Sequence, residues 1–344
     1  MSKGVKGVSD RRRVTIADVA RTAGVSATTV SFVLNDKQGV AIPDTTRQRV
    51  LEAVDALGYR PNAFAKNLGR GKSSFIGLIS DAIATTPFAG QLVKGAQDEA
   101  WRRGYVLLVT NTDGDREVEA EALAMMAEHQ VAGVLYSTWY HHRVEPPLAL
   151  TELPHVLVNC YADGSAVPAV VPDEVQGGRT ATELLLGAGH RRIAFLNSTE
   201  EAPATIGRFA GYREALSAHG VEEDPDLVMR VGFDQEGGHT GALRLLEIAD
   251  PPTAVFCYND RVAMGLYDAL RERGMRVPAD LAVVGFDNQE VIAGHLRPPL
   301  TTVALPHYEI GQEAVRVLLG GTATAALEDG AYRVACPPVV RQSL

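Results

Sequence analysis

The chain has 344 residues, of which 46% are hydrophobic and 22% charged, a composition typical of a globular protein with two or three domains. It holds no run of about 18 apolar residues, which argues against a membrane-spanning helix, and its three cysteines are too widely spaced for a disulfide framework. The net charge of -9 conceals two unlike parts, because residues 1–72 hold 13 Lys and Arg against 6 Asp and Glu whereas the remainder is strongly acidic. A basic head on an acidic body suits a protein of which only one part contacts phosphate groups.

The first 13 residues, MSKGVKGVSDRRR, are basic, and no apolar run with a cleavage site follows them. They match a signal peptide poorly, so we expect a disordered tail. Reduced cysteines and the lack of a signal peptide both favour a location in the cytoplasm.

Residues 14–35, VTIADVARTAGVSATTVSFVLN, have the pattern of two short helices joined by a tight turn. Thr15 is placed to cap the first helix, and Gly24 can take the left-handed conformation that ends it. Ser26 is placed to cap the second helix, whose apolar positions face inward. The positions left facing outward are Ala27, Thr28, Ser31 and Phe32. The pattern predicts a helix-turn-helix, with an ordinary helical hairpin as the alternative.

A third helix is expected at about residues 45–57, where Gly58 ends it, and three such helices can close a small core. The following segment, residues 63–68, is rich in helix-forming residues but only about two turns long, so it should be mostly unfolded by itself. It is either a hinge that becomes helical on contact with another molecule or a flexible linker. The composition leaves both interpretations open.

From residue 75 onward, apolar runs alternate with amphipathic segments. The runs predict seven buried strands, FIGLIS (75–80), YVLLVTN (105–111), VAGVLYS (131–137), HVLVNC (155–160), RIAFLNS (192–198), AVFCYND (254–260) and LAVVGFD (281–287). The helices between them are expected near residues 89–103, 116–129, 208–219, 236–248 and 260–274. This alternation is typical of parallel sheets covered on both faces, and its two successive sets predict two α/β lobes.

Polar residues stand where these strands end, and they include Ser80, Asp81, Ser137, Asn159, Asn197, Ser198, Asn259, Asp260, Asp287 and Asn288. Each one could simply cap the helix that follows. However, ligands of α/β sheets bind outside the carboxyl ends of the strands, and clefts between lobes favour this further. Together the residues predict a hydrogen-bonding rim around a ligand cleft.

Further motifs follow in order: RVLEAVDALGYRPN, GHRRIAFL, RFAGYREAL, YNDRVAMG, VVGFDN and PPLTTV. With this ordered set, from about Val14 to Arg341, the chain resembles the LacI/GalR (lactose-repressor) family of bacterial transcription regulators. The resemblance implies an all-α, three-helix helix-turn-helix head and a hinge, joined to a two-lobed α/β body with parallel sheets that is similar to a periplasmic binding protein. The expected domains are a tail (1–13), a DNA-binding domain (14–58), a hinge (59–72) and an effector-binding and dimerisation body (73–344). Lobe one is expected at about 73–172 and 304–330, and lobe two at about 173–303 and 331–344.

The resemblance also implies which residues contact double-stranded operator DNA. The base-contacting positions of the second helix correspond to Ala27, Thr28 and Phe32, and those that hold phosphates to Thr15, Ser26, Thr29, Ser31, Asn35 and Thr46. The hinge positions that enter the minor groove correspond to Ala65, Lys66 and Leu68, the last as a wedge between base pairs. Phe32 departs from the family, in which arginine is common there, so the guanine contact of an arginine is lost and an aromatic edge could lie against a thymine methyl instead; the preferred operator stays open.

The body is implied to bind a small-molecule effector. Arg208 corresponds to the arginine that holds ligand hydroxyls or a carboxylate, Asp287 to an acidic partner across the cleft, Asn259 to a polar contact and Phe233 to an aromatic platform. Further rim positions are Thr85, Phe88, Ser137 and Asn159. The set suits a sugar first and a purine or nucleoside second, while a salt bridge that braces the cleft is the structural alternative. Ala304 and Leu305, in TTVALP, replace a polar pair common in the family and make one wall more apolar.

The chain ends at VVRQSL without a leucine-heptad tail, so we expect a homodimer whose two recognition helices contact two half-sites. A solute-binding protein without a regulatory role is a further alternative, which the DNA-binding head argues against. No motif of a catalytic nucleophile, zinc site or dinucleotide fold is found, so we expect a protein that is not an enzyme and needs no cofactor or metal. His141 and His142 are interpreted as an exposed loop pair.

Overall fold

The computed structural model describes residues 14–34, 41–59, 73–82, 90–164, 167–328 and 330–344. The chain divides into two compact units, Met1–Ser73 and Ser74–Leu344, called the head and the body below. In the part of the chain that the structure describes, no helix is both long and apolar enough to cross a membrane.

The head contains the three predicted helices, α1 (Ile16–Ala23), α2 (Ala27–Leu34) and α3 (Asp44–Leu57). Thr15 caps α1 in a reciprocal capping box, in which its hydroxyl accepts from the Asp18 backbone and the Asp18 carboxylate accepts from the Thr15 backbone at 2.9 Å. Gly24 ends α1 at a φ of 66°, a left-handed conformation that glycine adopts without strain. Val19, Val30 and Val50 are fully buried between the three helices. The helix-turn-helix prediction is therefore confirmed.

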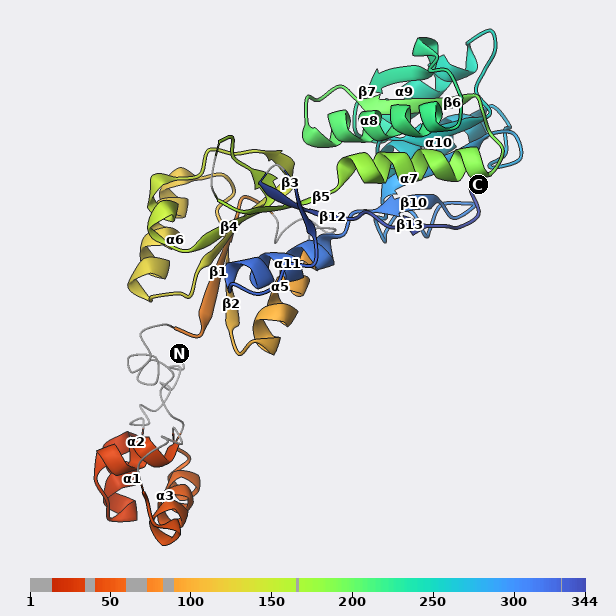
Figure 1. Ribbon diagram of the computed structural model, residues 1–344. Helices are drawn as coiled ribbons and strands as arrows, with labels where there is room; N and C mark the ends of the chain where they lie inside the picture. The colour runs from red at the N-terminus through yellow and green to blue at the C-terminus, as the bar shows by residue number, and fades with distance from the viewer. Residues whose placement is uncertain (1–13, 35–40, 60–72, 83–89, 165–166, 329) are drawn as a thin grey trace, which may run out of the picture. The chain divides into compact units, whose positions relative to one another are not determined.

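The body holds two mostly parallel sheets, which Figure 1 shows as two separate lobes. In the described residues, the first sheet has the order β11 (Ala326–Glu328), β12 (Ala331–Val334), β5 (Ala169–Pro172), β4 (His155–Tyr161), β3 (Val134–Arg143), β1 (Phe75–Ser80) and β2 (Val106–Asn111). The second has the order β13 (Pro338–Val339), β10 (Thr301–Ala304), β9 (Ala282–Asp287), β8 (Ala254–Cys257), β6 (Ile193–Ser198) and β7 (Val228–Val231). Among the described strands, only β11 with β12 and β10 with β13 pair antiparallel, so the predicted parallel α/β architecture is confirmed.

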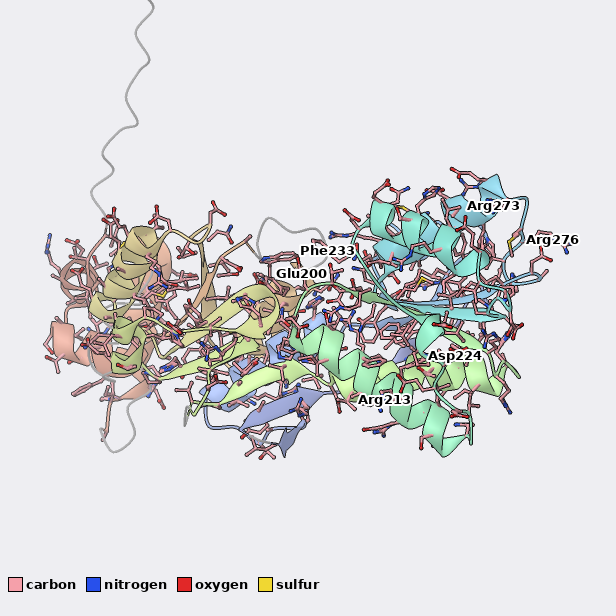
Figure 2. The ribbon with its side chains drawn as sticks, turned by 90° about the horizontal axis from the view of Figure 1, so that it is seen from above. Glu200, Arg213, Asp224, Phe233, Arg273 and Arg276 are labelled. Carbon is pink, nitrogen blue, oxygen red and sulfur yellow. The ribbon has the colours of Figure 1, made fainter. Side chains whose placement is uncertain are left out.

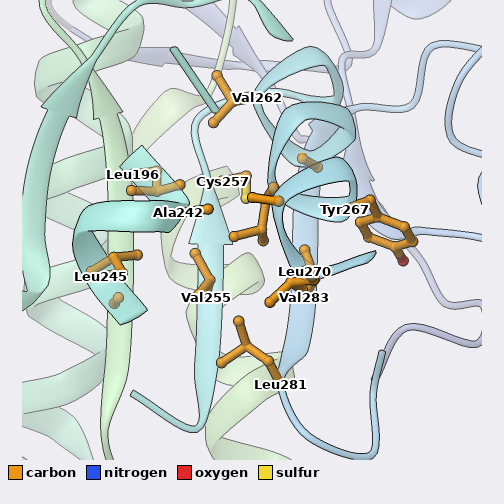
Figure 3. Close-up of a cluster of buried hydrophobic side chains, with 14 of the residues drawn as sticks. Leu196, Ala242, Leu245, Val255, Cys257, Val262, Tyr267, Leu270, Leu281 and Val283 are labelled. Atoms are coloured by element: carbon orange, nitrogen blue, oxygen red, sulfur yellow. The ribbon is translucent and has the colours of Figure 1, made fainter. Parts of the chain in front are cut away.

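Helices cover both faces of each sheet, as the long apolar runs require. In lobe one, α5 (Gly90–Arg102) and α11 (His307–Leu318) pack on one face and α6 (Arg116–Glu128) on the other. In lobe two, α7 (Glu174–Gly187) and α8 (Pro203–Ala218) cover one face, and α9 (Gln235–Leu246) and α10 (Asp260–Glu272) cover the other. Figure 3 shows Leu196, Val255 and Val283 of three neighbouring strands packed against α9 and α10. Two short 3-10 turns, Leu148–Glu152 and Pro225–Leu227, complete the described elements.

The structure differs from two expectations about the body. The strand at 105–111 is not buried, because β2 lies at the edge of its sheet and leaves Val106, Leu108 and Val109 about two-fifths exposed. Residues 331–334 belong to lobe one rather than lobe two, because β12 pairs with β5 of the first sheet. The chain therefore crosses between the lobes after β5, after β10 and after β12.

Candidate ligand cleft and nucleic-acid interface

The first turn of α2 presents small polar and apolar side chains to solvent. Ala27 and Thr28 are exposed, as the sequence predicts, whereas Ser31 and Phe32 are half-buried because α2 lies flat on the head core. Phe32 therefore offers only part of its ring to another molecule. Ala27 and Thr28 are the most accessible of the expected base contacts.

Three of the expected phosphate contacts already take part in helix capping. Besides Thr15, Ser26 accepts from the Thr29 backbone at 3.1 Å, and the hydroxyls of Ser26 and Thr29 lie 2.9 Å apart. Capping holds these hydroxyls at the amino ends of α1 and α2, where backbone N–H groups favour anions. Thr46 lies in the first turn of α3 and is half-buried.

Several predicted contacts lie outside the described residues. They are Asn35, Ala65, Lys66 and Leu68 for DNA, and Thr85 and Phe88 for the effector.

A cavity of about 200 Å³ lies in the body, where residues of both lobes meet. Five of the residues predicted from the sequence line it, namely Asn159, Arg208, Phe233, Asn259 and Asp287. Figure 2 shows Phe233 and Glu200 on the side of lobe two that faces lobe one. Part of the predicted rim thus meets in one cavity, to which residues from Asn159 to Asp287 contribute.

Arg208 is the most highly connected side chain of this cavity. It lies on α8 with only 3% of its surface exposed. Its Nε donates to Glu174 Oε2 at 2.8 Å, its Nη1 donates to the Tyr258 carbonyl at 2.6 Å, and the same nitrogen lies 3.7 Å from Asp287 Oδ1. The guanidinium also lies 3.7 Å from the centre of the Phe286 ring. The side chain is therefore held rigidly, with its charge compensated inside the protein.

Glycines allow α7 and α8 to approach closely enough for this pairing. A Cβ at Gly178 would lie 2.3 Å from the Arg208 carbonyl, and one at Gly207 would lie 2.6 Å from the Glu174 Cβ. Both distances are shorter than any van der Waals contact, so a residue with a Cβ at either position would force the two helices apart. The close approach brings the carboxylate of α7 to the arginine of α8.

The buried charges stabilise one another. Burial raises the pKa of Glu174, but Arg208 and His141 outweigh burial and hold this pKa at about 2, so Glu174 is ionised. Burial raises the pKa of Asp287 to about 6, and Arg208 and Gln289 offset only part of that effect. Burial lowers the pKa of His307 to about 4, so this imidazole is neutral at pH 7. Near neutral pH the cavity therefore holds three carboxylates, Glu174, Glu200 and Asp287, beside two arginines and His141.

The two predicted amides contact the backbone rather than lying free in the cavity. Asn259 accepts from the Val262 backbone at 2.8 Å, which caps α10, and donates to the Phe233 carbonyl at 2.9 Å. Asn159 donates to the Thr138 carbonyl at 3.1 Å. The sequence left open whether the residues at strand ends only cap the following helix. Asn259 does cap its helix, and its amide also positions the Phe233 backbone.

Ser137 does not line the same cavity, contrary to the expectation. The predicted strand ends at Ser137, but β3 continues to Arg143, so this residue lies in mid-strand and is 1% exposed. It lines a separate pocket on lobe one instead. The extra length of β3 also shows that the interpretation of His141 and His142 as an exposed loop pair was wrong, because His141 is 8% exposed and its Nδ1 lies 3.6 Å from Glu174 Oε1.

Sequence reasoning missed other residues that line the cavity. They are Trp139, Tyr140, His141, Glu174, Glu200, Ala202, Ala204, Tyr258, Arg261, Gln289 and His307. Tyr258 and Gln289 lie one or two positions from predicted contacts, so a wider window around each strand end would have included them. Glu174 begins α7, where the chain passes from lobe one to lobe two after β5, and His307 begins α11, where it passes back after β10. The spacing of apolar residues in the sequence does not show where the chain passes between lobes.

A helix-turn-helix head and a two-lobed body with a ligand-sized cleft define a class of ligand-controlled DNA-binding proteins. Comparison with protein families agrees with this class. Residues 15–62 match the model described as bacterial regulatory proteins, lacI family, and residues 182–344 match the periplasmic binding protein-like domain.

Relatives extend the likeness over nearly the whole chain. The HTH-type transcriptional repressor PurR of Vibrio atlanticus is 35% identical over 307 residues, covering 89% of this chain and 91% of the relative. Among solved structures, the transcriptional regulator CelR in complex with cellobiose is 32% identical, with a TM-score of 0.63 over 96% of this chain and 100% of the other. The lac repressor dimer bound to operator and the anti-inducer ONPF is 27% identical, with a TM-score of 0.73 over 96% and 99%.

The chain belongs to the LacI family of bacterial regulatory proteins. It is a DNA-binding transcriptional repressor that responds to a ligand. Its matched relatives are regulators and not enzymes.

Proposed function

We propose that this protein is a homodimeric repressor whose affinity for operator DNA changes when an uncharged sugar binds in the cleft of the body. It would act in the cytoplasm, where the DNA is. The single observation that carries the choice of effector is the buried ion pair between Arg208 and Glu174.

The ion pair matters because Glu174 neutralises the positive charge of Arg208, which an anionic ligand would need as its partner. The cavity is lined by three carboxylates (Glu174, Glu200 and Asp287) and by two arginines (Arg208 and Arg261). A carboxylate or phosphate would lie beside these carboxylates and would have to displace Glu174 from Arg208. Hydroxyl groups carry no charge and can donate to carboxylates and accept from guanidinium groups.

A sugar site needs an aromatic surface as well as polar groups, and the cavity has aromatic residues. Trp139, Tyr140, Phe233 and Tyr258 line the same space. Aromatic faces pack against the apolar C–H face of a sugar ring, while polar groups around them fix its hydroxyls. CelR, one of the structural neighbours, is bound to cellobiose in its solved complex.

A purine base or nucleoside is the second candidate effector. The same four aromatic side chains could stack on a planar base, and Asn159 and Gln289 carry amides that could pair with its edge. The curated relatives from Vibrio are repressors named PurR. Such a ligand would act as a co-repressor.

The edge of lobe one supports the dimer. Val106, Leu108 and Val109 of β2 and Val118 and Met125 of α6 are large apolar side chains that are 38–59% exposed. Exposed apolar side chains along an edge strand and the helix beside it, of which Leu108, Val118 and Met125 line one groove, are typical of a protein–protein interface. Two copies related by a twofold axis would present two α2 helices to the half-sites of a symmetric operator.

Ligand and DNA would be coupled through the three crossings between the lobes. Ligand binding that favours one arrangement of the lobes changes the spacing of the two hinge segments in the dimer, and hence their ability to fold on DNA. A ligand that prefers one arrangement about 100-fold shifts the equilibrium by about 2.7 kcal/mol.

A thermal-shift screen of the full-length protein tests the effector class. The panel would contain neutral mono- and disaccharides, sugar phosphates, sugar acids, purine bases and nucleosides. We expect only neutral sugars to raise the melting temperature, because a ligand that binds the native state alone stabilises it. A rise with purines alone would favour the second candidate, and a rise with sugar phosphates would contradict the charge argument.

A gel mobility-shift assay on the DNA upstream of the protein's own gene then tests regulation. We expect a specific complex whose stability changes with the sugar found in the screen.

The Val109→Asp variant tests the dimer. A charge on β2 should leave the fold intact but yield monomers in analytical ultracentrifugation and weaken operator binding. Ile206→Asp is the matched control, because Ile206 is also an exposed apolar residue but lies on α8.

A further inference from the structure

Strand β3 carries a bulge near its carboxyl end. Its pairing with β4 shifts in register between Ser137 and His142, where β3 advances by five residues while β4 advances by two, from Val158 to Cys160. The extra residues form a β-bulge, which bends a strand and re-aims its side chains. Residues 138–142, with the sequence TWYHH, are called the β3 arm below.

Hydrogen bonds fix the base of the β3 arm to lobe one. The Thr138 hydroxyl can donate to the carbonyl of Tyr140 at 2.8 Å or to that of Asn159 at 3.0 Å. The Asn159 amide donates back to the Thr138 carbonyl at 3.1 Å, and the Trp139 backbone donates to Asp81 Oδ1 at 3.0 Å. The arm therefore moves with lobe one, and two residues expected at the ligand rim, Asp81 and Asn159, hold it in place.

The tip of the β3 arm reaches lobe two. Tyr140 and His141 line the ligand cleft together with Ala202 and Ala204 of lobe two. His141 is 8% exposed, and its Nδ1 lies 3.6 Å from Oε1 of Glu174, the first residue of α7. Among the ion contacts within the described ranges of the body, this is the one that joins side chains of different lobes. The contact is therefore sensitive to the arrangement of the lobes.

The contact between His141 and Glu174 is poised rather than complete. A hydrogen bond between nitrogen and oxygen spans about 2.7–3.2 Å, and His141 Nδ1 has no hydrogen-bond partner in the part of the chain that the structure describes. Glu174 uses its Oε2 for Arg208 at 2.8 Å, which leaves Oε1 for the imidazole. A buried nitrogen without a partner costs free energy. A movement of lobe one toward lobe two by about 1 Å or less would remove that cost.

We propose that the β3 arm is a strap between the lobes and that His141 is its positioning residue. When the cleft closes, His141 Nδ1 donates to Glu174 Oε1, so that the carboxylate which holds Arg208 also holds lobe one. An imidazole can donate from Nδ1 in its protonated form or in one neutral tautomer, so the bond does not require a positive charge. The strap shifts the equilibrium between the open and closed arrangements toward the closed one. This inference does not depend on which effector the cleft binds.

Spin labels on the two lobes test the strap in the full-length protein, without DNA or ligand. Glu117→Cys places one label on the first turn of α6 in lobe one, and Glu236→Cys places the other on the first turn of α9 in lobe two; both positions are exposed. The natural cysteines are buried, so the labels react with the introduced ones. An excess of unlabelled chain keeps both labels of a dimer on one chain. Double electron–electron resonance then measures the distance between the lobes.

The key substitution is His141→Phe, which keeps an aromatic ring against Tyr161 but removes both nitrogens. We expect it to lengthen the mean distance between the labels and to broaden the distribution, because the strap is lost. His141→Asn should keep the wild-type distribution, since the asparagine amide nitrogen lies close to the place of Nδ1 and can donate. His142→Phe is the matched control, because His142 Nδ1 lies 2.9 Å from the Tyr140 carbonyl oxygen within the arm.

Three outcomes would overturn the strap. They are a wild-type distribution for His141→Phe, an equal shift for His141→Phe and His142→Phe, and a shift that persists in His141→Asn. Far-UV circular dichroism shows whether each variant is folded, and the smaller His141→Leu should give the same shift if phenylalanine prevents folding. No effector is present in these measurements, so a failure of the proposed sugar site would leave their result unchanged.

Discussion

Helix α2 of the head and the ligand cleft of the body both carry residues proposed to contact another molecule, but they hold those residues differently. Ala27 and Thr28 of α2 are exposed and make no contribution to a core. Arg208 and Glu174 are almost fully buried and bonded to each other before any ligand arrives. A substitution of an exposed residue of α2 should therefore change what the protein binds without changing its stability, whereas a substitution in the cleft should change both.

The largest expected effect is the loss of Glu174. Glu174→Ala leaves the Arg208 guanidinium buried without its main partner, which typically costs about 3–5 kcal/mol. Urea denaturation should show a lower free energy of unfolding. Glu201→Ala is the control, since Glu201 forms an exposed ion pair with Arg230 whose loss should cost less than about 1 kcal/mol. Equal effects of the two variants would contradict the distinct role of the buried pair.

Arg208→Lys should have an intermediate effect. Lysine keeps the charge but has a single nitrogen, so it cannot bond Glu174 and the Tyr258 carbonyl in the same fork geometry or lie flat on Phe286. We expect a loss of about 1–3 kcal/mol of stability, as for other buried groups left unsatisfied. Calorimetry with the sugar from the screen should show at least tenfold weaker binding. Unchanged affinity would indicate that Arg208 only braces the cleft, which was the structural alternative.

In the head, Phe32→Arg should change specificity rather than stability. An arginine at this half-buried position can keep its aliphatic stem on the head and extend its guanidinium toward a guanine, a contact worth about 1–3 kcal/mol of discrimination. Selection of binding sites from random DNA should show a new preference for guanine at one symmetric pair of positions. Gln48→Arg, on the exposed side of α3, should not change the selected sequence. Identical preferences of all three proteins would refute the assignment of Phe32.

The smallest effect concerns pH. Because burial raises the pKa of Asp287 to about 6, the folded protein holds this proton more tightly than the unfolded chain, in which the pKa is 3.8. The resulting stabilisation is present at low pH and is lost as the pH rises through about 6. Asp287 should contribute about 1 kcal/mol more at pH 5 than at pH 7.5. Asp287→Asn should lack this increment when unfolding is followed at both pH values, and an unchanged difference would contradict the assignment.

Much of the architecture could be predicted from local patterns. Thr15, Gly24 and Ser26 mark the ends of two helices through their own capping preferences, and the apolar runs from Phe75 onward predict the strands of two sheets. The resemblance to the LacI family implied Arg208, Asp287, Asn259 and Phe233 as ligand contacts, and the rule that ligands bind at the carboxyl ends of parallel strands also indicated Asn259 and Asp287. The helix ends and strands depend on residues that are close in sequence, and therefore the sequence alone determined them.

Contacts between distant segments were decided only by the tertiary structure. Glu174 pairs with Arg208 because glycines allow α7 and α8 to touch, and His141 enters the cavity because β3 runs six residues past its predicted end. The sheet edge exposes the apolar β2, and β12 returns to lobe one through its pairing with β5. Periodicity records which residues share a face of one element, but not which elements become neighbours. The class of this protein is thus apparent in its sequence, while the composition of its ligand site depends on packing between segments more than a hundred residues apart in the chain.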